Sequence, residues 1–178
     1  MNFKIPLISL LLLAGCVSMP PPAPPKPEAQ PVAVPPPPPQ AARAADWLDR
    51  PITQGNWELG RDTLGSFAAF AKPGANADFT IRCIRATKGI RLARAGLVPE
   101  NGSGVMTLRA ADASKAYTVT NDRLVPPYAF VEIPASDRQL DAIAFSRGRF
   151  LVSMDGTNDL VIPDWPEIAR VIEDCRGR

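Results

Sequence analysis

Residues 79–94 read Phe-Thr-Ile-Arg-Cys-Ile-Arg-Ala-Thr-Lys-Gly-Ile-Arg-Leu-Ala-Arg, and this stretch decides the fold class. Apolar and polar side chains alternate in both halves, which is typical of strands that bury one face. The alternating apolar residues are Phe79, Ile81, Cys83, Ile90 and Leu92. The Lys88-Gly89 pair between the halves is typical of a turn, so the stretch predicts an antiparallel hairpin.

The same period of two recurs along most of the chain, with turn residues between the repeats. The repeats are Trp57/Leu59, Phe67/Ala69, Met106/Leu108, Tyr117/Val119, Phe130 with its neighbours, Phe150/Val152/Met154 and Leu160/Ile162. Short strands spaced about ten residues apart favour a sandwich or a barrel. We therefore expect residues 46–178 to form a single mainly β (α+β) domain, an antiparallel β-sandwich or barrel of about 8–9 short strands.

Two segments change to the helical period. A capping-box pattern begins at Ser136, and it predicts a short helix near 137–146 that Gly148 ends. Asp164 stands before Pro166 and Glu167, which predicts the cap of a second helix near 165–175. The apolar stripe of that helix comprises Ile168, Val171, Ile172 and Cys175. This stripe should pack on the sheet.

The first 15 residues have the features of a secretory signal peptide: a basic start, an apolar run and small residues before a cysteine. Leu13-Ala14-Gly15-Cys16 resembles the lipobox of bacterial lipoproteins. The resemblance implies cleavage after residue 15 and lipidation of Cys16, which would anchor the chain to a membrane. Val17, in place of the Asp that marks inner-membrane retention in such families, favours the outer membrane with the domain facing the periplasm. The inner membrane and the cell surface are weaker alternatives.

Residues 16–45 are expected to form a disordered, proline-rich stalk. Twelve of the 21 residues from Met19 to Pro39 are proline. Proline has no amide proton and a fixed φ, so the segment is excluded from helices and sheet ladders and favours polyproline II. A spacer is the first interpretation, and a ligand for an aromatic groove at residues 22–27 is the alternative.

If lipid modifies Cys16, two cysteines remain. Cys83 and Cys175 each lie on the apolar face of their predicted element, and an exported chain can pair them in an oxidising compartment. We predict a Cys83–Cys175 disulfide that joins the last helix to a strand. Two unpaired core cysteines are the alternative.

The composition bounds the chemistry of the domain. The chain has 20 basic and 18 acidic residues, a balance that argues against nucleic acid as a partner. It has no histidine, which removes the commonest general base and metal ligand. We expect no cofactor, no metal and no enzymatic activity. A carboxylate-dependent hydrolase using Asp137/Asp141 or Asp155/Asp159 is a distant alternative.

Two groups of residues are candidates for binding. Ser146, Arg147 and Arg149 surround Gly148, and their guanidinium groups suit an anion or an acidic side chain. Arg82 and Arg91 should point outward from the predicted hairpin and suit lipid phosphates or an anionic cell-wall polymer. A helix end with its ordinary cations and a plain solvated sheet face are the respective alternatives.

The segment from Phe145 to Cys175 resembles the strand, strand, helix and cysteine ending of uncharacterised small periplasmic and lipoprotein families of Gram-negative bacteria. The resemblance supports the fold and the disulfide and implies no known activity. The sequence thus predicts an envelope lipoprotein that binds an envelope protein or an anionic component, in an accessory, structural or assembly role. An inhibitor of a wall-degrading enzyme such as lysozyme is the alternative.

Overall fold

The structure is a computed structural model, and it describes residues 47–98, 104–122 and 126–177. The expected signal peptide (1–15), the lipidated Cys16 and the proline-rich stalk (16–45) lie outside the described residues. Within the described part, no helix is long and apolar enough to cross a membrane.

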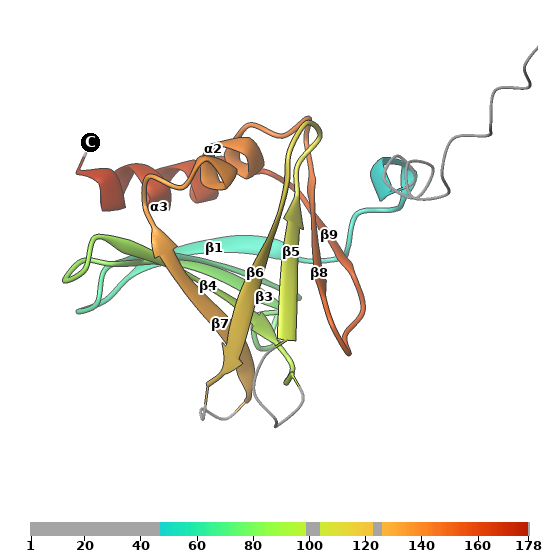
Figure 1. Cartoon of the computed structure of the whole chain (residues 1–178), viewed down its shortest axis with the longest axis horizontal. Coiled ribbons are helices and arrows are strands. Elements are labelled where there is room, and N and C mark those ends of the chain that lie inside the picture. Colours follow the sequence, from blue (N-terminus) through green and yellow to red (C-terminus); the bar gives the residue numbers. More distant parts are fainter. Residues whose placement is uncertain (1–46, 99–103, 123–125, 178) are drawn as a thin grey trace, which may run out of the picture. The chain divides into compact units, whose positions relative to one another are not determined.

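Nine antiparallel strands form one curled sheet, a half-barrel, in the order β1-β2-β3-β4-β7-β6-β5-β8-β9 (Figure 1). The strands are β1 (Asn56–Arg61), β2 (Ser66–Ala71), β3 (Phe79–Ile84), β4 (Gly89–Ala95), β5 (Gly104–Arg109), β6 (Ser114–Asn121), β7 (Tyr128–Pro134), β8 (Phe150–Met154) and β9 (Leu160–Ile162). The predicted fold class and the number of strands are confirmed.

The β3–β4 hairpin forms as its sequence predicts. Ile81 lies opposite Leu92 and Cys83 lies opposite Ile90, and these side chains are buried. Lys88 adopts a left-handed φ of 52° in the turn, next to Gly89. The hairpin thus supplies the centre of the core, which also contains the edge-to-face aromatic contacts Trp57–Phe70, Trp57–Phe79 and Phe79–Phe150.

Two strands join the two parts of the curled sheet, and they separate along most of their length. In the described residues, β6 pairs with β7 only through Thr120↔Phe130 and Asn121↔Ala129. By contrast, β6 pairs with β5 along 114–119, and β7 pairs with β4 along its whole length. In Figure 1, β6 and β7 meet at one end and diverge toward α2. We call this opening the β6–β7 split; its rims are residues 114–119 of β6 and 131–134 of β7.

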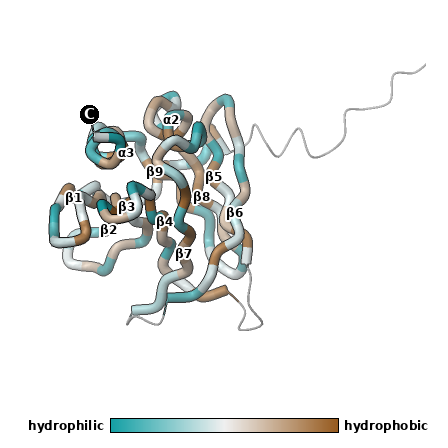
Figure 2. Tube along the Cα trace, turned by 60° about the vertical axis from the view of Figure 1, so that its left-hand side comes forward, coloured by the Kyte–Doolittle hydropathy of each residue, from teal (hydrophilic) through white to brown (hydrophobic). Residues whose placement is uncertain are grey.

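Both predicted helices are present, α2 (Arg138–Ala144) and α3 (Pro166–Arg176), and they lie beside each other over one side of the sheet (Figure 2). The predicted caps are wrong by one residue. Asp137, not Ser136, caps α2, because its carboxylate accepts the N–H of Gln139. Trp165, not Asp164, occupies the N-cap position of α3 and makes no side-chain bond there.

The end of α2 also differs from the prediction. The helix stops at Ala144, before Gly148, and the N–H of Phe145 closes the last turn by donating to the carbonyl of Asp141. Gly148 instead lies within the following loop, where its φ of 81° suits a glycine.

The apolar stripe of α3 packs as predicted: Ile168, Val171, Ile172 and Cys175 are all buried. The structure places the sulfur atoms of Cys83 and Cys175 at disulfide distance, with their Cα atoms 5.3 Å apart. A covalent link at this point would hold the end of α3 against β3, in the register that the helix stripe already favours.

The buried face of β2 is the opposite of the one that Phe67 and Ala69 suggest. Ala68 and Phe70 are fully buried, whereas Phe67 is only partly buried and its ring carries the guanidinium of Arg82, 4.5 Å from the ring centroid. All residues of β2 after Ser66 are apolar, so the alternation alone does not identify the inner face.

Two other predicted inner residues face outward. Leu59 of β1 is exposed, and Phe130 of β7 is partly buried beneath Arg91. In both cases an apolar residue contributes to the surface of a strand instead of the core, which is common because surfaces retain much apolar area.

The free edge of β9 is covered by the segment before β1. The N–H of Thr53 donates to the carbonyl of Val161 (2.8 Å), and the N–H of Val161 donates to the Thr53 hydroxyl (3.0 Å). Trp47, in the short 3-10 helix Trp47–Asp49, packs against Leu151 and Val161.

Candidate functional site

The loop between α2 and β8, residues 145–149, contains three of the five predicted binding residues, and it is held from two sides. We call it the α2–β8 loop. Ser146 is buried, and its hydroxyl accepts the N–H of Ala111 (3.1 Å) and donates to the carbonyl of Arg149 (2.5 Å). This serine therefore fixes the path of the loop and is not available to a ligand.

Arg149 also has a structural role. Its guanidinium donates to the carbonyls of Leu48 (3.1 Å) and Arg50 (2.9 Å) and so binds the loop to the segment before β1. Hydrogen bonds from a charged donor are stronger than neutral ones, so this side chain holds two distant parts of the chain together. Of the three predicted residues, Arg147 is the one that the structure leaves for a partner.

Arg147 is exposed, and its side chain forms no hydrogen bond or ion pair within the described residues. Phe145, two positions earlier, is 76 % exposed. Trp165 is 41 % exposed and directly precedes α3. The fold thus presents the phenyl ring of Phe145 and the guanidinium of Arg147 on one fixed loop.

Asp164 is a partly buried acidic residue just before α3. Burial raises the pKa of its carboxyl group, and the backbone N–H groups of Asp164 itself and of Gly148 partly oppose that shift. The hydrogen bonds of Ser146 and Arg149 fix the α2–β8 loop, which leaves little conformational freedom for a partner to remove.

The second predicted group, Arg82 and Arg91, does not form a free basic stripe. The two residues face each other across β3 and β4 and point outward as expected. However, Arg82 bonds the carboxylate of Asp62 (2.6 Å), and Arg91 donates twice to Glu132 (2.7 and 3.0 Å). Their charges are compensated, because each guanidinium has a carboxylate from a neighbouring strand or turn.

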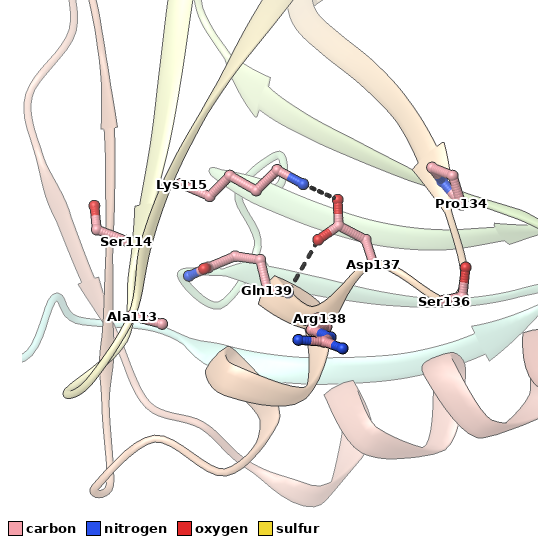
Figure 3. Close-up of a pocket in the computed structure, with 8 residues that line it drawn as sticks. All are labelled: Ala113, Ser114, Lys115, Pro134, Ser136, Asp137, Arg138 and Gln139. Atoms are coloured by element: carbon pink, nitrogen blue, oxygen red, sulfur yellow. Dashed lines mark hydrogen bonds and ion pairs between the residues drawn. The ribbon is translucent and has the colours of Figure 1, made fainter.

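A hollow of about 470 Å³ lies at the open end of the β6–β7 split (Figure 3). It is lined by Ala113, Ser114, Lys115, Pro134, Ser136, Asp137, Arg138 and Gln139. In Figure 3 the side chain of Lys115 extends from β6 across the opening to Asp137 at the start of α2. Its ammonium group lies 2.6 Å from the carboxylate, so the ion pair links β6 to the start of α2.

The electrostatics of this ion pair favour the charged form of Asp137. Burial opposes ionisation, since the side chain of Asp137 is only 7 % exposed. The hydrogen bonds from Lys115 and from the N–H of Gln139 outweigh that cost and lower the pKa of Asp137. Behind the pair, burial and the charge of Asp137 raise the pKa of Tyr117, so its hydroxyl stays protonated at neutral pH.

The carboxylates that would serve a hydrolase have other partners. Asp137 pairs with Lys115, Asp141 pairs with Arg176 (2.6 Å) and Asp159 pairs with Arg50 (2.7 Å). Asp155 accepts the backbone N–H of Val105 (3.2 Å). Within residues 47–98, 104–122 and 126–177, no group of three acidic or cysteine side chains could hold a metal ion.

Sequence reasoning missed Phe145, Trp165 and the Lys115–Asp137 pair. Phe145 and Trp165 are aromatic residues at the ends of predicted helices, a position from which exposure cannot be inferred. Lys115 and Asp137 are 22 positions apart, and the tertiary structure brings the start of α2 close to β6.

No family model, curated protein or solved structure matches this chain.

Proposed function

We propose that the chain is a lipid-anchored protein of the bacterial envelope, attached to the outer membrane through Cys16, whose β domain acts by binding another protein. The observation that carries the binding role is the α2–β8 loop, which is held by internal hydrogen bonds yet exposes Phe145 and Arg147. The role is accessory, structural or one of assembly, and it involves no catalysis.

The chemistry of the exposed residues suits a protein partner. Aromatic residues and arginine dominate the energetically important centres of protein interfaces. Phe145 and Arg147 provide this combination on a loop that requires little ordering on binding. A partner with an apolar pocket next to a carboxylate would match both components.

The arginines of the β3–β4 hairpin are less well suited to bind lipid phosphate or an anionic polymer. Arg82 and Arg91 are each already bonded to a carboxylate. An anion would have to displace Asp62 or Glu132, so this face offers little net attraction.

Site-specific photo-crosslinking in intact cells tests the binding role. A photoreactive phenylalanine analogue at position 145 should give one discrete crosslinked product, because the partner covers this side chain. The same analogue at Leu64, an apolar residue with 53 % exposure in another turn, is the matched control and should give none. The product at position 145 should disappear when Arg147→Glu is added. Equal crosslinking at both positions, or crosslinking at position 145 that Arg147→Glu does not reduce, would exclude this loop as the binding site.

Inhibition of a wall-degrading enzyme is the second candidate function. The single exposed guanidinium of Arg147 on a fixed loop could enter the acidic cleft of a lysozyme-type enzyme. The protein should then lower the lysozyme rate stoichiometrically, and Arg147→Glu should abolish the inhibition while Arg170→Glu, another exposed arginine, should not. An unchanged rate at excess protein would remove this candidate and leave the binding role intact.

A further inference from the structure

The edge of β6 that faces the β6–β7 split carries backbone groups that have no partner among the residues that the structure describes. Backbone groups point to alternate sides along a strand. The N–H of Asp122 points toward β7, because it donates to the carbonyl of Tyr128 (2.6 Å), and the carbonyl of Ala113 points toward β5, because it accepts from Ala110 (2.7 Å). The N–H and C=O groups of Ser114, Ala116 and Thr118 therefore point into the split, where β7 has already diverged.

The other strand edges of the described sheet are more fully protected than this one. Thr53 covers the edge of β9, and Pro134 occupies the rim of β7 on the far side of the split. The outer edge of β1 carries Glu58 and Arg61. Covers, prolines and charges are the usual means of blocking an edge. Along the edge of β6, Ser114, Ala116 and Thr118 are exposed and small, and Lys115 is the one charged residue, at the open end.

The charge at the open end of the split is positive. Lys115 and Arg138 line the hollow with one carboxylate, Asp137. Asp137 compensates the charge of Lys115, whereas Arg138 is exposed and forms no ion pair within the described residues, so Arg138 carries the excess positive charge. The open end thus suits a carboxylate.

We propose that the β6–β7 split binds an extended peptide segment of another protein, which adds to the edge of β6 as an antiparallel strand and places a carboxylate beside Lys115 and Arg138. Main-chain hydrogen bonds provide affinity in this mode of recognition, and side-chain contacts provide specificity. Every strand pair of the sheet is antiparallel, so the carboxylate belongs at the C-terminal end of the added segment, next to Ser114.

The proline-rich segment of this chain does not suit this site. Twelve of the 21 residues from Met19 to Pro39 are proline and cannot donate a backbone hydrogen bond. The occupant is therefore a segment of another protein with free amide groups.

Fluorescence anisotropy tests the proposal on the full chain purified in detergent, with the peptide Val-Thr-Val-Thr-Asp, which carries a fluorophore in amide linkage on its N-terminus and an amidated C-terminus. Two N-methylated versions block alternate amides. Strand addition predicts that one version loses affinity by about tenfold or more and the other binds as the parent does, because alternate amides face β6. Lysine in place of the aspartate should also weaken binding by about tenfold.

Two variants locate the site. Ala116→Pro removes an N–H that points into the split and should abolish binding, whereas Ala116→Ser keeps that N–H and should bind as the natural chain does. Arg147→Glu should leave peptide affinity unchanged, which separates this site from the α2–β8 loop. If Ala116→Pro fails to fold, as judged by circular dichroism, the two N-methylated peptides decide the question with the natural chain.

Several results would overturn the proposal. They are the absence of binding by the parent peptide, equal loss with both methylation patterns, or full binding to a folded Ala116→Pro variant. Self-association of the protein that displaces the peptide would also overturn it, since the natural occupant would then be a second copy of the chain.

Discussion

Two arginines of the α2–β8 loop, two positions apart, have opposite roles. Arg149 donates to the carbonyls of Leu48 and Arg50, whereas Arg147 is exposed and bonds to nothing within the described residues. The first side chain stabilises the domain, and the second is available to a partner.

This contrast gives a prediction about stability. Arg149→Ala should lower the free energy of unfolding by about 1–3 kcal/mol, since it leaves two carbonyls without their charged donor. Arg147→Ala should change it by less than about 0.5 kcal/mol, as is usual for an exposed side chain. Urea denaturation of both variants checks this, and equal destabilisation would contradict the assigned roles.

Asp137 gives a prediction about pH. Its pKa is lower in the folded chain than its ordinary value, so the ionised carboxylate stabilises the fold at pH above that value. The contribution is lost as the pH falls through the folded pKa, because the folded chain must then take up the proton that the unfolded chain already holds.

Asp137→Asn is the matched variant, because asparagine keeps the ability to cap α2. Near neutral pH it should be less stable than the natural chain by about 1 kcal/mol, a modest value because Lys115 is half exposed. The difference should shrink as the pH falls through the lowered pKa of the folded chain, below which the carboxyl is protonated in both states. Urea denaturation at neutral pH and at a series of acidic pH values measures it, and a difference independent of pH would show that the ion pair contributes nothing.

At the scale of elements, α3 depends on both its apolar stripe and the cysteine pair. The Cα atoms of Cys83 and Cys175 lie 5.3 Å apart, and 92 positions separate the two residues. A disulfide across a loop of this length would restrict the unfolded chain strongly, by about 4–5 kcal/mol in the chain-entropy model.

The corresponding prediction concerns the oxidised state. The protein isolated from cells should contain no titratable thiol at these two positions and should migrate differently on electrophoresis after reduction. The double variant Cys83→Ala/Cys175→Ala should be less stable to urea by no more than about 4–5 kcal/mol, since engineered and natural bridges often contribute less than the model. Two reactive thiols in the denatured native protein would contradict the disulfide.

Elements also differ in how clearly their sequences specify them. In the β3–β4 hairpin apolar and polar residues alternate, and in α3 the apolar residues recur with the helical period. The buried faces of both were therefore predicted correctly. In β2 the residues after Ser66 are all apolar, and the wrong face was inferred from Phe67 and Ala69. The helix caps were displaced by one residue, because Ser136 and Asp137 are both good caps and only backbone geometry decides between them.

At the scale of the molecule, attachment to a membrane is a proposal from the lipobox, which lies outside the described residues. Cys16→Ser should move the protein from the membrane fraction to the soluble fraction, because the lipid is the proposed anchor. The domain should remain folded, which circular dichroism of the released protein would show. Persistent membrane association would mean that another part of the chain binds the membrane.

Sequence alone determined the class of the domain, the number of strands and the packing stripe of α3, because these follow from local alternation of apolar and polar residues. It also identified the α2–β8 loop, from a glycine between arginines after a helix. Tertiary structure decided which of those arginines is available, how Arg82 and Arg91 are compensated, and where β6 separates from β7. These features depend on contacts between residues far apart in the chain, such as Arg149 with Leu48 and Lys115 with Asp137, and no local pattern records which distant groups the folded sheet brings together.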